Sequence, residues 1–259
     1  MPHPCAHFAH GWVHRAKRDL LLLSVISLVA PAASFAQSVP ATKPATTPSK
    51  QAPPAQPAIN NNIIVLDPAH GGEDTGAHIG QLNEKDINMQ LATRLRSLLQ
   101  ARTFDVKLLR DGDPTPAPTA DQRAGAANQM HAAVCIVLHS SATGEGVHIY
   151  TSALKAASET GSSAIVRWDR AQTSYIQQSM RLSDKLSEAL TRSRMATSNG
   201  RTFVAPLDAL QCPAILIELG PIHGGNTLPS DTGYQQTVAD AIAGTLLQWR
   251  EDAKAVVKQ

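Results

Sequence analysis

Residues 63–72 read Ile-Ile-Val-Leu-Asp-Pro-Ala-His-Gly-Gly, and this stretch indicates the fold. The four leading residues are apolar and predict a short buried strand. The strand runs through Asp67 into His70, and the two glycines that follow allow turns and close approach of the backbone. The stretch therefore predicts a buried strand whose carboxyl end leads into candidate functional residues.

From residue 62 onward, short apolar runs alternate with segments of helical periodicity, which is typical of an α/β layer fold. After the first strand we predict five further strands, at residues 104–109, 133–138, 146–151, 202–207 and 214–219. Between and after them we predict helices at residues 83–98, 119–130, 168–192 and 232–249. We expect one folded domain over residues 62–252, with residues 253–259 as a C-terminal tail.

The first 36 residues have the features of an export signal. Arg15, Lys17 and Arg18 precede an apolar run at residues 20–29, and Ser34-Phe35-Ala36 is a pattern that signal peptidases accept. The run is nearer ten residues than the roughly twenty that span a bilayer, so we expect cleavage and no stable membrane span afterwards. These features predict a protein exported to the periplasm or cell envelope.

Residues 37–61 are rich in proline, alanine and threonine and predict a disordered linker, because little apolar surface is available to offset chain entropy. The charge of the chain is close to balanced, with 23 Lys and Arg against 21 Asp and Glu. All of this small excess lies in residues 1–36, where Arg15, Lys17 and Arg18 stand against Asp19. The remaining chain has no strong field, which argues against nucleic acid as a partner.

Two cysteines lie in or beside apolar strand-like runs of the predicted domain, Cys135 and Cys212. A buried cysteine usually behaves as a small apolar residue, so we expect free thiols rather than a metal-ligand pair. An exported protein could also join them in a disulfide, and the sequence leaves their redox state open.

Several predicted strands end in residues that can bind a metal or move protons: His70 after the first, His139 after residues 133–138, and Glu218 within residues 214–219. In open α/β sheets, ligands bind outside the carboxyl ends of the strands, so these side chains should meet. Glu84 opens the first predicted helix and should return to the same edge. Two histidines, a carboxylate and an open position form a catalytic zinc site, and a second carboxylate can act as base.

Each candidate also has an ordinary structural explanation. His70 could occupy a glycine turn, His139 could be a hydrogen-bonded core histidine, and Glu84 could favour a helix start through the helix dipole. Glu218 is harder to explain in this way, because a carboxylate among apolar neighbours is costly to bury without a partner. The remaining histidines of the domain are expected at the surface or in loops: His78, His131, His148 and His223, of which His223 follows Glu218 closely enough to line the site.

The chain resembles the zinc-dependent N-acetylmuramoyl-L-alanine amidases (amidase_3 type) over about residues 62–250. The resemblance is carried by Ile64 to Gly72, Glu84-Lys85-Asp86, Leu109-Arg110-Asp111, Arg123 to Asn128, Ile136 to Ser140 and Ile217 to Gly220. It implies a twisted, mostly parallel six-stranded sheet with helices on both faces. It also implies that His70, Glu84 and His139 bind Zn²⁺ and that Glu218 is the catalytic carboxylate.

The implied reaction is hydrolysis of the amide between N-acetylmuramic acid and L-alanine in peptidoglycan, during cell-wall turnover, remodelling or daughter-cell separation. Peptidoglycan is then the main partner, an activator or targeting protein is left open, and we expect a monomer. The sequence departs from the family pattern at Ala69, at Ser140-Ser141 and at Pro221-Ile222-His223. Two alternatives stay open: a zinc peptidase acting on stem peptides, and an inactive metal-binding scaffold that recognises the wall.

Overall fold

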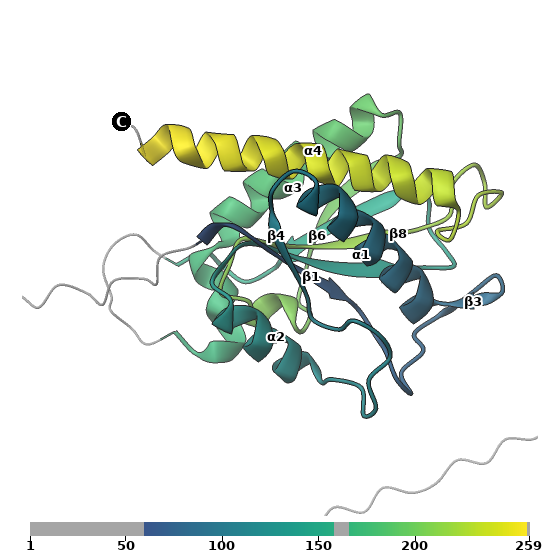
Figure 1. The fold of residues 1–259 in the computed structure, drawn as a ribbon, viewed down its shortest axis with the longest axis horizontal. Coiled ribbons are helices and arrows are strands. Elements are labelled where there is room, and N and C mark those ends of the chain that lie inside the picture. Colours follow the sequence, from purple (N-terminus) through teal and green to yellow (C-terminus); the bar gives the residue numbers. More distant parts are fainter. Residues whose placement is uncertain (1–59, 158–165, 258–259) are drawn as a thin grey trace, which may run out of the picture. The chain divides into compact units, whose positions relative to one another are not determined.

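The computed structural model describes residues 60–157 and 166–257 (Figure 1). Within these ranges six strands form one sheet, in the order β4-β1-β5-β8-β6-β7. The strands are β1 (Asn60–Pro68), β4 (Asp105–Leu108), β5 (Ala132–Ser140), β6 (Val147–Ser152), β7 (Thr197–Thr202) and β8 (Ala214–Leu219). Strands β4, β1, β5 and β8 are parallel, and β6 runs antiparallel to β8. The predicted six-stranded, mostly parallel sheet is confirmed.

Helices cover both faces of this sheet. One face packs against α1 (Glu84–Gln100), α3 (Ile176–Arg192) and α4 (Thr232–Val257). The other packs against α2 (Ala120–Gln129) and the short 3₁₀ helix η2 (Leu207–Ala209), beside which lies a second 3₁₀ helix, η1 (Trp168–Ser174). Figure 1 shows α2 on the opposite side of the sheet from α1 and α4. The predicted α/β fold with helices on both faces is therefore confirmed.

The apolar stripe of α1 explains how this helix is held. Ile87, Leu91, Leu95 and Leu99 recur every four residues and are fully buried. Burying each such side chain contributes about 1.5–3 kcal/mol relative to leaving it exposed. This packing fixes the first residue of α1, Glu84, beside the carboxyl ends of β1 and β5. A small hairpin of β2 (His78–Ile79) and β3 (Leu82–Asn83) connects β1 to α1.

The prediction of a strand at residues 202–207 is wrong. The strand there is β7 at Thr197–Thr202, a polar segment at the edge of the sheet. The apolar residues that suggested a strand, Val204 and Leu207, instead pack into the core on the α2 face. Apolar content alone did not separate a strand from a packed loop.

Two predicted helix boundaries also differ. The helix expected at residues 168–192 is divided, because η1 ends at Ser174 and α3 begins at Ile176, with a non-helical backbone at Arg170. The final helix continues to Val257, so the tail predicted for residues 253–259 begins inside α4. The predicted signal peptide at residues 1–36 and nearly all of the predicted linker at 37–61 lie outside the described residues. None of the helices in the described ranges is both long and apolar enough to cross a membrane.

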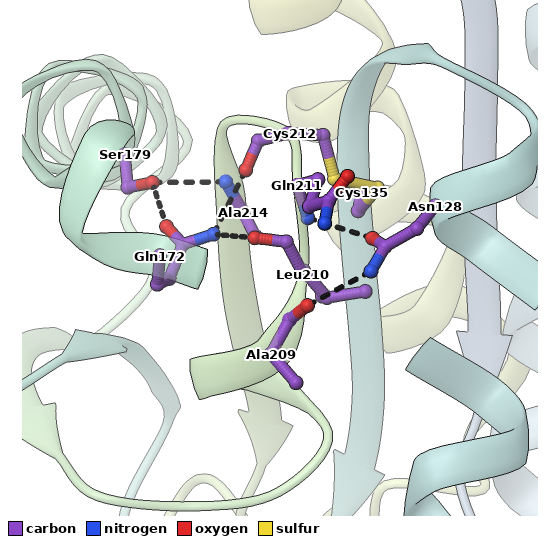
Figure 2. Close-up of a disulfide and its surroundings, with 9 residues drawn as sticks. All are labelled: Asn128, Cys135, Gln172, Ser179, Ala209, Leu210, Gln211, Cys212 and Ala214. Carbon is purple, nitrogen blue, oxygen red and sulfur yellow. Dashed lines mark hydrogen bonds between the residues drawn. A yellow bond between two sulfur atoms is a disulfide. The ribbon is translucent and has the colours of Figure 1, made fainter. Parts of the chain in front are cut away.

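The expectation of free thiols is wrong, because Cys135 and Cys212 form a disulfide (Figure 2). Cys135 in β5 pairs with Ala214 in β8, two residues after Cys212. The sheet thus brings the two Cα atoms to 6.1 Å, a separation that a disulfide can bridge. Around this bond, Gln172 donates to the carbonyls of Leu210 and Cys212.

Candidate active site

The loop after β1 carries His70 and is held by two buried arginines. Arg123 donates to the carbonyl of His70 at 2.6 Å and pairs with the buried Asp67 at 2.5 Å. Arg110 donates to the carbonyls of Pro68 and Ala69 at 2.8 and 3.2 Å. His70 itself has a φ of +64°, which is uncommon for a residue with a side chain. The guanidinium groups hold this loop and so set where the His70 imidazole points.

Glu84 is almost fully buried at the start of α1, and its carboxylate is surrounded by donors. The backbone N–H groups of Ala77 and Ser140 donate to its two oxygens at 3.0 and 3.2 Å. Gly76 makes room for it, because a Cβ there would lie 2.7 Å from both Glu84 Oε2 and His70 Cδ2. The turn that contains Gly76 and the end of β5 therefore fix the position of the carboxylate.

The structure brings three of the predicted site residues together. His139 Nδ1 donates to Glu84 Oε1 at 2.7 Å, and His70 Nε2 lies 3.1 Å from Glu84 Oε2. One ligand atom from each of the three residues lies within 4.8 Å of the others. Two imidazoles and one carboxylate are donors that divalent metals such as zinc accept, with a fourth position left open. The donor set therefore fits a catalytic metal site.

A neighbouring carboxylate orients one of these histidines. Asp74 Oδ2 accepts a hydrogen bond from His70 Nδ1 at 2.8 Å, which leaves Nε2 facing Glu84. Such a carboxylate–histidine contact commonly fixes the ring of a metal ligand. Hydrogen bonding of the imidazole to the carboxylates of Glu84 and Asp74, which accept, raises the pKa of His70 above its ordinary value. Burial alone would raise the pKa of Glu84, but the hydrogen bonds from His139 and His70 outweigh it and hold that pKa below its usual range.

Glu218 lies one strand away from this cluster. It pairs in register with His139, so the two side chains lie on the same face of the sheet at its carboxyl edge. Its side chain is partly buried, and its carboxylate makes no hydrogen bond or ion pair with other residues in the described ranges. The predicted fourth residue thus lies beside His139 in the sheet but forms no hydrogen bond or ion pair with the other three.

His148 was expected at the surface or in a loop; it is partly exposed, but it lies in strand β6 beside Glu218 rather than in a loop. The two residues pair across β6 and β8, and the His148 ring bonds to the hydroxyl of Ser198 at 2.7 Å. His78, His131 and His223 are exposed, as predicted. The strand pattern at residues 146–151 was visible in the sequence, but its antiparallel register against β8 was not, so the proximity of His148 to Glu218 could not be foreseen.

The two arginines were also not assigned a role from the sequence. Arg110 and Arg123 are 6% and 7% exposed although both carry a charge. A signal was present, since each lies in a segment of the family pattern. Apart from the Arg123–Asp67 ion pair, however, these side chains mainly donate to backbone carbonyls, and contacts of that kind leave no pattern in a sequence.

Comparison with known proteins identifies the family. The family model of N-acetylmuramoyl-L-alanine amidase (Amidase_3) matches residues 64–248. The germination-specific N-acetylmuramoyl-L-alanine amidase of Bacillus subtilis is 27% identical over 201 residues, which cover 74% of this chain and 81% of that protein. A shorter match, 40% identical over 83 residues, covers 31% of this chain and 32% of the N-acetylmuramoyl-L-alanine amidase CwlM of Bacillus licheniformis.

A solved structure shows the same fold. The N-acetylmuramyl-L-alanine amidase Ami1 from Mycobacterium smegmatis superimposes with a TM-score of 0.60 at 19% identity, covering 75% of this chain and 99% of that one. The family model spans most of the described residues, including every element that carries the cluster. This chain therefore belongs to the N-acetylmuramoyl-L-alanine amidases, enzymes that act on the peptidoglycan of the cell wall.

Proposed function

We propose that this amidase depends on zinc, that His70, Glu84 and His139 hold the ion, and that Glu218 is the catalytic carboxylate. The observation that supports this most directly is the convergence of two imidazoles and a buried carboxylate within 4.8 Å. Zinc bound by such ligands acts as a Lewis acid towards an amide carbonyl and makes water acidic enough to react near neutral pH.

Glu218 carries the proton in this proposal. Its carboxylate takes a proton from the attacking water as the oxygen–carbon bond forms, and passes it to the amide nitrogen as the carbon–nitrogen bond breaks. The products are the lactyl carboxylate of muramic acid and a stem peptide with a free L-alanine amino group. The absence of a partner for Glu218 among the described residues suits this role, because its oxygens stay available to water and substrate.

The finer biological role is part of the same proposal. We infer an exported protein of the periplasm or cell envelope, with a signal peptide at residues 1–36, a linker at 37–61 and a catalytic domain from residue 62. Its action serves wall turnover, remodelling or daughter-cell separation. An activator or targeting protein and a monomeric state stay predictions.

Mass spectrometry of digested peptidoglycan tests the chemistry. Wild-type protein with zinc should release stem peptides that begin with a free L-alanine, and Glu218→Gln should lower the rate by about 100- to 10,000-fold, the range for loss of a general acid–base group. Glu188 is an exposed carboxylate on α3, so Glu188→Gln is a matched control that should retain full activity.

Two results would contradict the proposal. Cleavage inside the stem peptide would favour the zinc peptidase. Wall binding without any released product, at any zinc concentration, would favour the inactive scaffold. Equilibrium dialysis gives an independent check, since Glu218→Gln should bind one zinc ion per chain as tightly as the wild type does.

A further inference from the structure

A small pocket lies against the predicted metal ligands on the α2 face of the sheet. It has a volume of about 160 Å³, and the side chains of His70 and His139 form part of its wall. The rest of the lining is mixed, because some residues are charged and others are small or apolar. The charged ones are Asp67, Asp74 and Arg123, and the small or apolar ones are Ala69, Pro118, Ala120, Val137, Ala205 and Pro206. Pockets that enclose a whole drug-sized ligand measure roughly 300–1,000 Å³. This pocket is therefore the size for one group of a larger substrate.

The pocket and Glu218 lie on different sides of His139. In the sheet β5 stands between β1 and β8. The pocket takes its lining from the ends of β1 and β5, from the start of α2, and from the loop that contains Ala205 and Pro206. Among the described residues that line it, none belongs to β8, where Glu218 lies. A substrate bound at the cluster thus has Glu218 on one side and the pocket on the other.

The reaction decides which half of the substrate faces the pocket. This step rests on the proposed function, in which Glu218 takes a proton from water and gives it to the amide nitrogen. Both the water and the nitrogen must then face Glu218, while the carbonyl oxygen faces His70, Glu84 and His139. The lactyl α-carbon is the third substituent of the reacting carbonyl carbon, so it points away from β8.

We propose that this pocket receives the lactyl group of the muramoyl half and selects for it. The lactyl methyl contacts apolar side chains such as Val137 and Pro206, and the stem peptide leaves along the β8 side. Because the pocket is small, it favours substrates with a lactyl group over substrates with a glycolyl group, which lacks the methyl. A pocket of this kind distinguishes two substrates that differ by one such group by roughly 10- to 200-fold.

Two matched substitutions test the assignment. Ala205 is exposed at the rim of the pocket, so Ala205→Leu narrows the pocket without disturbing the core. Ala126 is exposed on α2 and lies outside the pocket lining, so Ala126→Leu is the control. Four synthetic substrates are compared: muramoyl peptides with a lactyl or a glycolyl ether, each with L-alanine or glycine as the first residue.

Wild type and Ala126→Leu should prefer lactyl over glycolyl substrates by at least about tenfold in kcat/KM. Ala205→Leu should lose this preference and keep its ratio of L-alanine to glycine substrates. The proposal is overturned if Ala205→Leu changes only the L-alanine to glycine ratio, because the pocket then holds the peptide. It is also overturned if neither ratio changes. A Glu218→Gln protein that cleaves as fast as the wild type would instead contradict the proposed function.

Discussion

Strands β5 and β8 lie side by side, and their two ends are built differently. Near their amino ends a disulfide joins Cys135 to Cys212, and Gln172 donates to nearby backbone carbonyls (Figure 2). At their carboxyl ends His139 and Glu218 pair in register, and the carboxylate of Glu218 has no partner among the described residues. The same strand pair is therefore cross-linked by a disulfide at one end, the closed end, and carries His139 and Glu218 at the other, the reactive end. We therefore expect stability to depend on the first end and chemistry on the second.

The largest effect, on zinc affinity and activity, should come from Glu84, the carboxylate that lies between His70 and His139. Glu84→Ala removes the group that both histidines contact, so zinc affinity should fall by more than the roughly 100-fold seen when a supporting residue is lost. Amidase activity should drop to background. Zinc titration by calorimetry and release of stem peptides measure both. Unchanged zinc affinity would remove Glu84 from the ligand set.

Breaking the closed end should cost stability and spare the metal site. The double substitution Cys135→Ala with Cys212→Ala removes a bond between residues 77 positions apart, and the free energy of unfolding should fall by about 2–4 kcal/mol. Urea unfolding measures this change. Zinc affinity should stay within about twofold, because the ligands lie at the other end of the strands. A large loss of zinc affinity would show that the two ends are coupled.

A smaller loss of stability is expected from the hydrogen bonds around the disulfide. Gln172 is fully buried, donates to Leu210 and Cys212, and accepts from Ser179. Gln172→Ala leaves these buried groups without partners and should lower the free energy of unfolding by about 1–3 kcal/mol. Gln177 is exposed on α3, so Gln177→Ala should change it by less than about 0.5 kcal/mol. Equal effects of the two substitutions would contradict the importance of this network.

The smallest effect on stability is expected for the hydroxyl of Ser140, which lies next to His139 in β5. The Ser140 hydroxyl donates to buried Asn88 at 2.9 Å, while the Ser140 backbone N–H donates to Glu84. Ser140→Ala removes only the hydroxyl, so unfolding should become easier by about 1 kcal/mol and most activity should remain. Ser187→Ala, at a partly exposed site on α3, is the control. A Ser140→Ala protein without activity would show that this hydroxyl contributes to the reaction directly.

The central part of the fold could be predicted from sequence because its signals are local. The strands at residues 63–66, 133–138 and 214–219 are short apolar runs, and a central parallel strand is buried on both faces. Because parallel strands end at one edge, their terminal side chains could also be expected to converge. The structure brings His70, Glu84 and His139 together as expected, while the roles of these residues and of Glu218 remain predictions.

The features that could not be predicted depend on which strands become neighbours. The disulfide requires β8 to lie beside β5, although Cys212 is 77 positions from Cys135 in the chain. The position of His148 requires an antiparallel register between β6 and β8. The true edge strand β7 is polar, whereas the apolar Val204 lies in the loop that follows and is partly buried against the core, so local hydrophobicity favoured the wrong segment. Which strands become neighbours in the sheet cannot be read from the residues of any one strand.

The position of β8 has a consequence for how the protein folds as it is synthesised. This strand is the last of the sheet to be made, yet it lies between β5 and β6, near the centre. Until it emerges, β5 and β6 have no neighbour between them, and the chain lacks Glu218. A domain of this kind assembles as one unit rather than piece by piece. A chain that ends before β8 therefore lacks a central strand of the sheet, and on the proposed function it also lacks its catalytic carboxylate.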